Sequence, residues 1–204
     1  MRDQALFASG LLVEKIGGPS VKPPQPSGLW EAVGYTSSNT AKFQADTGAE
    51  KVHRRSLYIF WKRTSPPPQM TITDAPSRES CTVRRERTNT PLQALLLMNE
   101  PQYVEASRAL AQRALKQGGE SVEGRLVYLF RLVTSRRPES NELAALSAGL
   151  RDLLEHYRKE VGAAKDLVAQ GETKADPAID PSELAAWSMI ANAVLNLDEV
   201  VTKG

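Results

Sequence analysis

The sequence predicts a mainly α-helical protein, in which a C-terminal helical bundle follows a loop-rich segment that is rich in arginine and proline and holds one or two short strands. Two observations lead to this fold class. Ten of the 13 prolines fall between Pro19 and Pro101, whereas the chain beyond them shows apolar residues at helical spacing. The boundary is expected near Thr90, with residues 1–89 and 90–204 forming two differently built parts of one continuous unit.

The composition fits an ordinary globular chain of one domain or two small ones. The 204 residues are 41% hydrophobic and 25% charged, which is enough to bury a core. No run approaches the roughly 18 consecutive apolar residues of a membrane span. A single cysteine and two histidines leave a zinc site or covalently bound haem without its ligands. We therefore expect no metal, no haem and no other cofactor in this chain.

The first half holds two expected elements. Residues Asp3–Ile16 predict a helix, because apolar residues recur along it and Gly17-Gly18 provides an end. The run Leu57–Trp61 is the best candidate strand, since aromatic and β-branched residues favour strands. Apolar residues on both of its faces predict burial on both sides. Three prolines at 66–68 would stop any ladder there.

Capping residues mark where the helices of the second half begin. Thr90 is followed by proline and, three positions on, by Gln93, which predicts a capped helix over Leu92–Met98. Pro101 breaks it. The remaining helices are expected from about Gln102 to Gln117, through Leu126 to near Ser135, from Leu143 to Tyr157, and after an Asp180 cap. Their apolar stripes predict a core that includes Leu95, Leu110, Leu129, Phe130, Leu146, Leu153, Trp187 and Leu195.

Positive charge gathers in the segment from Lys51 to Thr90. It carries nine Lys or Arg against three acids, while the rest of the chain has 17 basic and 21 acidic residues. Seven of the nine are arginines, whose planar fork binds sulfate, phosphate or carboxylate. One interpretation is an anionic-ligand site with tryptophan stacking, formed by Arg54, Arg55, Trp61, Arg63, Arg78, Arg84, Arg85 and Arg87. The other is that these arginines bind backbone carbonyls and the three acids, and so replace a regular ladder.

No catalytic group stands out. His53 adjoins arginines and no carboxylate, so a catalytic base there is weakly indicated. His156 is expected at the surface of an amphipathic helix. Cys81 lies near Arg84, a setting that activates some thiols, but an ordinary buried cysteine is the favoured interpretation because no second feature supports a nucleophile. Nucleic-acid binding is less favoured, since no recognised motif accompanies the charge.

Three stretches of the chain have distinctive sequences. They are KIGGPSVKPPQPSGLWEAV at 15–33, the region 54–107, and ELAAWSMIANAVLNLDEVVTK at 183–203. The second contains SLYIFWKRTSPPP and RRERTNTPLQALLLMN, which are long and unusual strings. Together they resemble a C-terminal domain of unknown function, of planctomycete PSD type, in large secreted Planctomycetes proteins that often carry a cytochrome c-like domain. The resemblance extends over essentially the whole chain.

The resemblance implies export to the periplasm or cell surface, a haem c module upstream and a suspected role in polysaccharide breakdown. It supplies no catalytic residue. The chain shows neither an export signal nor a haem motif of its own, so we expect a fragment whose partners include the missing upstream domains.

We expect an accessory or scaffolding module of a larger exported protein, with anionic polysaccharide as a candidate ligand. The alternative is part of a glycan-active enzyme whose site is completed by upstream sequence.

Overall fold

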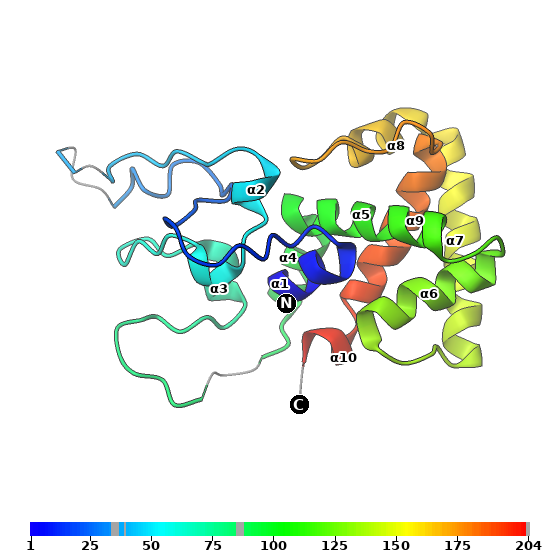
Figure 1. Ribbon diagram of the computed structural model, residues 1–204, viewed down its shortest axis with the longest axis horizontal. Helices are drawn as coiled ribbons and strands as arrows, with labels where there is room; N and C mark the ends of the chain where they lie inside the picture. Colours follow the sequence, from blue (N-terminus) through cyan, green and yellow to red (C-terminus); the bar gives the residue numbers. More distant parts are fainter. Residues whose placement is uncertain (34–36, 39, 85–87, 203–204) are drawn as a thin grey trace.

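The structure is a computed structural model that describes residues 1–33, 37–38, 40–84 and 88–202. Within these residues it is mainly α-helical, as predicted, with a helical bundle on one side and a loop-rich segment on the other (Figure 1). The helices are α1 (Arg2–Ser9), α2 (Ala49–Val52), the 3₁₀ turn η1 (Ser56–Tyr58), α3 (Pro68–Ile72), α4 (Pro91–Asn99), α5 (Pro101–Gln117), α6 (Val122–Thr134), α7 (Ser140–Lys159), α8 (Val161–Val168), α9 (Pro181–Leu195) and α10 (Asp198–Val201). No described helix is both long and apolar enough to cross a membrane.

The core of the bundle forms around α9, which packs against α5, α7 and α8. Alanines at 185, 186 and 191 are fully buried, and small residues of this kind let neighbouring helices approach closely. Trp187 is 1% exposed. Helix α1 also packs against α5 and so joins the start of the chain to the bundle (Figure 1).

The predicted core is confirmed except at one position. Five of its members are buried, namely Leu110, Leu129, Phe130, Trp187 and Leu195. Leu146 and Leu153 are partly buried and pack against the same cluster. Leu95, however, is 59% exposed, because α4 turns Gln93 and Leu97 toward the protein instead.

Capping chemistry fixed the helix starts as predicted. Thr90 accepts a hydrogen bond from the Gln93 backbone, and the Gln93 side chain accepts one from the Thr90 N–H, which completes a capping box. Asp180 accepts bonds from the backbones of Ser182 and Glu183 at 3.0 Å. At the break before Pro101, the Glu100 side chain caps α5 in the same way.

The first helix is shorter than predicted. It ends at Ser9 rather than Ile16, because Gly10 adopts a left-handed conformation with φ of 80°. The N–H groups of Leu11 and Leu12 both turn back to the Leu6 carbonyl, which is how a helix closes at a left-handed residue. The chain then runs out of the helix, and Val13 forms a single bridge with Arg54.

The predicted strand over Leu57–Trp61 was wrong. Its first residues form η1, Leu57 is 76% exposed, and only Ile59 makes a bridge, with Val21. Among the described residues, isolated bridges replace the one or two short strands. Val21 is flanked by Pro19 and Pro23, which have no N–H to extend a ladder.

Candidate functional site

Of the predicted ligand arginines that the structure describes, Arg54 is the one that the fold buries. Its guanidinium donates to the carbonyls of Lys15 at 3.1 Å, Gly17 at 2.5 Å and Pro19 at 2.9 Å. It also lies 3.8 Å from the ring centroid of Tyr58. These contacts supply hydrogen bonds to a loop that no strand ladder satisfies. Arg54 therefore has a structural role, as the second interpretation of the basic segment proposed.

The other described arginines of that segment lie at the surface. Arg55 pairs with Glu14 at 3.6 Å and Arg63 with Glu79 at 3.8 Å. Arg78 covers the ring of half-buried Trp61, with its guanidinium carbon 4.9 Å from the centroid. Arg84 is exposed, whereas Arg85 and Arg87 lie outside the described residues.

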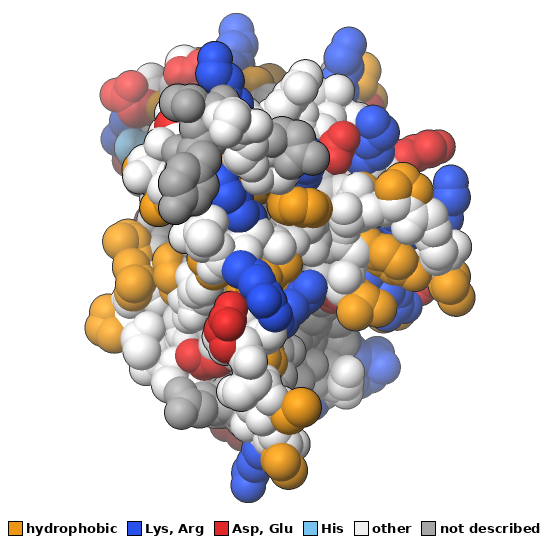
Figure 2. Space-filling view, turned by 90° about the vertical axis from the view of Figure 1, so that its left-hand side faces the viewer, with side chains coloured by type: hydrophobic (Ala, Val, Ile, Leu, Met, Phe, Trp, Pro, Cys, Tyr) orange, Lys and Arg blue, Asp and Glu red, His pale blue; other side chains and the backbone are white. Residues whose placement is uncertain are grey.

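Basic side chains do not form one continuous field on the side that carries the loop-rich segment. Figure 2 shows Lys and Arg scattered there among acidic and apolar groups. Trp30, the other tryptophan of the loop-rich segment, is 2% exposed and packs against Phe43 and Phe60. It is thus the centre of a small apolar cluster and not a binding surface.

A buried polar network joins the loop-rich segment to the bundle. His53 Nε2 lies 3.0 Å from Glu105 Oε2, and each side chain is 1% exposed. The other oxygen of Glu105 accepts bonds from the Thr173 backbone at 2.7 Å and from its hydroxyl at 2.6 Å. No carboxylate adjoins His53 in the sequence, and the one beside it in the fold is that of Glu105 on α5. Since His53 and Glu105 are each only 1% exposed, this His–Glu–Thr arrangement holds the fold together and is not an open catalytic triad.

Burial alone would raise the pKa of Glu105. The hydrogen bonds from His53 and Thr173 outweigh it and lower the pKa to about 2. Gly171 allows this close packing, because a Cβ at that position would lie 2.4 Å from the Glu105 Cδ atom. The carboxylate is thus held ionised between three segments of the chain.

Two more buried arginines also join the loop-rich segment or other distant parts of the chain to the helices. Arg108, 1% exposed, donates to the carbonyls of Val168, Gln170 and Thr173. Arg2, at the start of α1, donates to Gln102 at 2.7 Å and to the carbonyls of residues 52 and 54 at 2.5 and 2.8 Å. Burial lowers the pKa of each guanidinium. Each arginine therefore binds segments that are distant in sequence.

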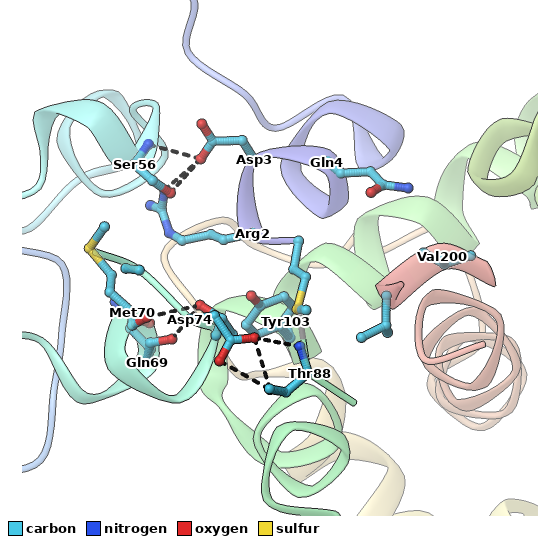
Figure 3. Close-up of a pocket in the computed structure, with 14 residues that line it drawn as sticks. Arg2, Asp3, Gln4, Ser56, Gln69, Met70, Asp74, Thr88, Tyr103 and Val200 are labelled. Carbon is cyan, nitrogen blue, oxygen red and sulfur yellow. Dashed lines mark hydrogen bonds and ion pairs between the residues drawn. The ribbon is translucent and has the colours of Figure 1, made fainter. Parts of the chain in front are cut away.

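A polar cavity of about 370 Å³ lies between α1, α3, α5 and α10 (Figure 3). Its walls carry the side chains of Asp3, Ser56, Asp74, Thr88 and Tyr103. Asp3 accepts bonds from the Ser56 backbone at 2.8 Å and hydroxyl at 2.6 Å. Asp74 accepts from the Thr88 backbone at 2.9 Å and from its hydroxyl. Burial raises the pKa of Tyr103, so its hydroxyl stays protonated and can donate.

This cavity offers hydrogen-bonding groups and two carboxylates, but no metal centre. Within the described ranges, no group of three or more His, Cys, Asp or Glu side chains is placed to hold a metal ion. Cys81, expected to be buried, is exposed, because it lies in a loop with no core around it. His156 is exposed, as predicted, and its ring packs edge-on against Tyr157.

The family to which the chain belongs is shown by its first three-quarters. A family model described as PSD1, protein of unknown function (DUF1553), matches residues 1–150. The chain belongs to this family. The resemblance to a PSD-type domain of unknown function is thereby confirmed, although the distinctive stretch at 183–203 lies beyond the matched region. No curated protein and no solved structure matches the chain.

The buried groups that hold this PSD1 chain together were mostly missed in its sequence. No known sequence motif includes these buried groups, which are Arg2, Tyr103, Glu105 and Arg108. A signal was present in α5, where Glu105 and Arg108 stand three positions apart within the otherwise neutral stretch 102–111. Charged residues on a face that their neighbours bury need partners. That pattern indicates a buried pair but does not say which distant residues complete it.

Glu100 makes the stability of this PSD1 domain depend on pH. Burial raises the pKa of its carboxyl to about 7, even though the backbones of Gln102 and Tyr103 donate to it. A folded-state pKa above the ordinary value of 4.5 means that the folded state holds the proton more tightly. Stability should therefore fall as the pH rises from about 4.5 to about 7.

We expect Glu100→Gln to remove this part of the pH dependence, because the amide keeps a capping oxygen and does not ionise. Urea unfolding at pH 5 and pH 8 measures it. The loss between the two should be larger in the wild type by about 2 kcal/mol, since each pKa unit corresponds to 1.36 kcal/mol and solvent access reduces the full value. Equal losses in both proteins would contradict the assignment.

Proposed function

We propose that this PSD1 chain is an accessory module of a larger exported protein and that it binds anionic polysaccharide at Trp61 and Arg78. The observation that carries the proposal is the exposed guanidinium of Arg78 over the Trp61 ring, at 4.9 Å, with Arg63 two residues after Trp61 and paired with Glu79 at 3.8 Å. Arginine forks suit sulfate and carboxylate groups, and the indole of Trp61 supports the Arg78 guanidinium that would meet such a group. Arg55 and Arg84 are further exposed arginines that a longer glycan would meet.

The accessory role rests on how the buried charges are used. Arg2, Arg54 and Arg108 donate to backbone carbonyls, and His53 pairs with Glu105. These groups hold a loop-rich segment on a helical bundle, which gives exposed loops a fixed position. A scaffold of this kind supports binding residues on loops.

The place of the module in the cell follows from the resemblance stated above. We propose that it acts in the periplasm or outside the cell, next to upstream domains that include a haem c module. The alternative, part of a glycan-active enzyme, finds its support in the cavity of Figure 3, where the carboxylates of Asp3 and Asp74 share one space. Both carboxylates already accept several hydrogen bonds from neighbouring residues, so the binding module is the better supported function.

The contact with polysaccharide should be local and weak. Basic side chains are scattered on this side of the molecule (Figure 2), so a long polyanion meets only a few charges. Exposed charge pairs are screened within about 8 Å at physiological ionic strength. Binding should therefore weaken steeply as salt is added.

We expect the double variant Arg63→Ala with Arg78→Ala to lose retention on a sulfated polysaccharide column at low salt. Its thermal melt should stay nearly unchanged, because both side chains are exposed. The matched control is Arg137→Ala with Arg158→Ala, which removes two exposed arginines from the bundle and should leave retention intact. Absence of retention in the wild type, or equal losses in both double variants, would refute the polysaccharide site.

A further inference from the structure

The polar cavity of Figure 3 holds a carboxylate that the polysaccharide site does not use. Among the described residues that line this space of about 370 Å³, the charged side chains are those of Arg2, Asp3 and Asp74. Asp3 pairs with Arg2 at 3.4 Å. The Asp74 carboxylate accepts hydrogen bonds from Thr88 and Gln93, and both of these residues are neutral. Within the part of the chain that the structure describes, the negative charge of Asp74 is therefore not balanced by an ion pair.

A second polar group at the cavity, the Tyr103 hydroxyl, lacks a partner within the described residues. Tyr103 makes its hydrogen bonds there through its backbone, as in the bonds with Glu100 and Ser107. The residue is 3% exposed and lines the cavity, and Figure 3 shows its oxygen directed into the space that Arg2 and Asp74 border. A buried tyrosine hydroxyl normally has a hydrogen-bond partner. This hydroxyl is therefore available to a ligand in the cavity.

The groups that line the cavity disfavour an anion and a metal ion. All three nitrogens of the Arg2 guanidinium already donate to protein atoms, so none is left to hold an anion, which would also meet the charge of Asp74. A metal ion needs several ligands, and within the described ranges no group of three His, Cys, Asp or Glu side chains is placed to hold one. A neutral ligand would leave the charge of Asp74 unbalanced. The ligand that suits these walls is an organic cation.

We propose that this cavity binds a primary ammonium group on an alkyl stem, and that Asp74 and Tyr103 hold the ammonium. An ammonium supplies three donors, and the carboxylate and the hydroxyl oxygen both accept. The charge-assisted bond to Asp74 gains strength because the cavity removes it from bulk water. The alkyl stem lies against the apolar part of the wall, which is formed by Met70, Ala75, Val200 and Val201. A volume of about 370 Å³ is within the range of small-molecule sites.

Titration of the chain with n-butylammonium chloride at pH 7, followed by ligand-observed NMR, tests the proposal. We expect a Kd on the order of 1 mM, because so small a ligand has few atoms with which to gain affinity. n-Butanol has the same stem without the charge and should bind about tenfold more weakly or less. Butyrate should not bind. Equal affinities for the ammonium and the alcohol would overturn the proposal, and so would displacement of the ammonium by equimolar Ca²⁺.

Variants at the two ligand-binding residues locate the site. Asp74→Asn should weaken butylammonium binding about tenfold and leave butanol binding unchanged, because the amide keeps the shape of the side chain but not its charge. Asparagine also tolerates the left-handed backbone at this position, where φ is 57°. The matched control is Asp152→Asn, which removes an exposed carboxylate from α7 and should have no effect. Unchanged binding in a folded Asp74→Asn variant would refute the assignment.

Tyr103→Phe is the second variant, and it should fold because the hydroxyl it removes has no partner among the described residues. Butylammonium binding should weaken several-fold. This variant carries the test if a thermal melt shows that Asp74→Asn is unstable, and an affinity equal to that of the wild type would then overturn the proposal.

A free amine and the side chain of a lysine in a peptide offer the same ammonium on an alkyl stem. Nα-acetyl-lysine N-methylamide, which carries the lysine side chain between two peptide groups, distinguishes these sources. Binding of butylammonium without binding of this probe identifies a site for a free amine. Binding of both, with both weakened in Asp74→Asn, identifies a site that also accepts a lysine of a peptide. Failure of both probes to bind the wild type would overturn the proposal and would leave the polysaccharide site untouched, since neither Trp61 nor Arg78 lines this cavity.

Discussion

Glu105→Ala should lower the free energy of unfolding by about 3 to 5 kcal/mol, the loss typical of removing one partner of a buried ion pair, which Glu105 forms with Arg108 at 3.7 Å. The change removes the partner of His53 and of both donor groups of Thr173 at once. His53 is 1% exposed, so its ring nitrogen, left without a partner, carries its full desolvation penalty. The missing side chain also leaves a cavity beside Gly171.

Urea unfolding at pH 7 measures this loss. The control is Glu155→Ala, which removes an exposed ion pair with Lys159 and should cost less than about 1 kcal/mol. Acid titration adds a second test. Because the pKa of Glu105 is lowered to about 2 from an ordinary 4.5, its contribution is present above pH 4.5 and is lost as the pH falls toward 2. Glu105→Gln should not show that loss, and a small effect of Glu105→Ala would place the carboxylate in water.

Trp187→Ala should also cost about 3 to 5 kcal/mol, as expected for an aromatic side chain removed from a core. Trp187 is 1% exposed on α9, the helix that packs against α5, α7 and α8. Trp187→Phe keeps most of the ring volume and should cost clearly less. Thermal and urea unfolding measure both variants, and a loss below about 1 kcal/mol for Trp187→Ala would mean that the ring lies at the surface.

Local chemistry made much of the bundle predictable from the sequence. The Thr90 and Asp180 caps act through residues within three positions, so the sequence alone specifies them. Apolar periodicity placed Leu110, Phe130 and Trp187 in the core for the same reason. The prediction that Leu95 lies in the core was wrong, because periodicity identifies an apolar face but does not say whether another part of the molecule covers it.

The candidate site was less predictable, because its contacts join distant parts of the chain. His53 meets Glu105, 52 positions away, and no spacing rule reports such a pair. The predicted strand failed for a related reason: strand propensity needs a partner segment, and the one beside Ile59 is interrupted by prolines. Arginine enrichment did indicate that carbonyls needed donors, and Arg54 fulfils that interpretation.

The distances in sequence spanned by the buried network have a consequence for folding. The bond from Arg2 to Gln102 closes a loop of 100 residues, and that from Thr173 to Glu105 one of 68. Loop closure of this length costs entropy before it gains any contact, whereas α5 and α6 form and pair locally. We therefore expect the network to form after the local pairing of α5 with α6, together with the equally long-range packing of α1 and α9 on α5, and to be largely absent from the transition state. Interactions of that kind slow unfolding while leaving the folding rate nearly unchanged, so the buried charges act chiefly to extend the lifetime of the folded chain.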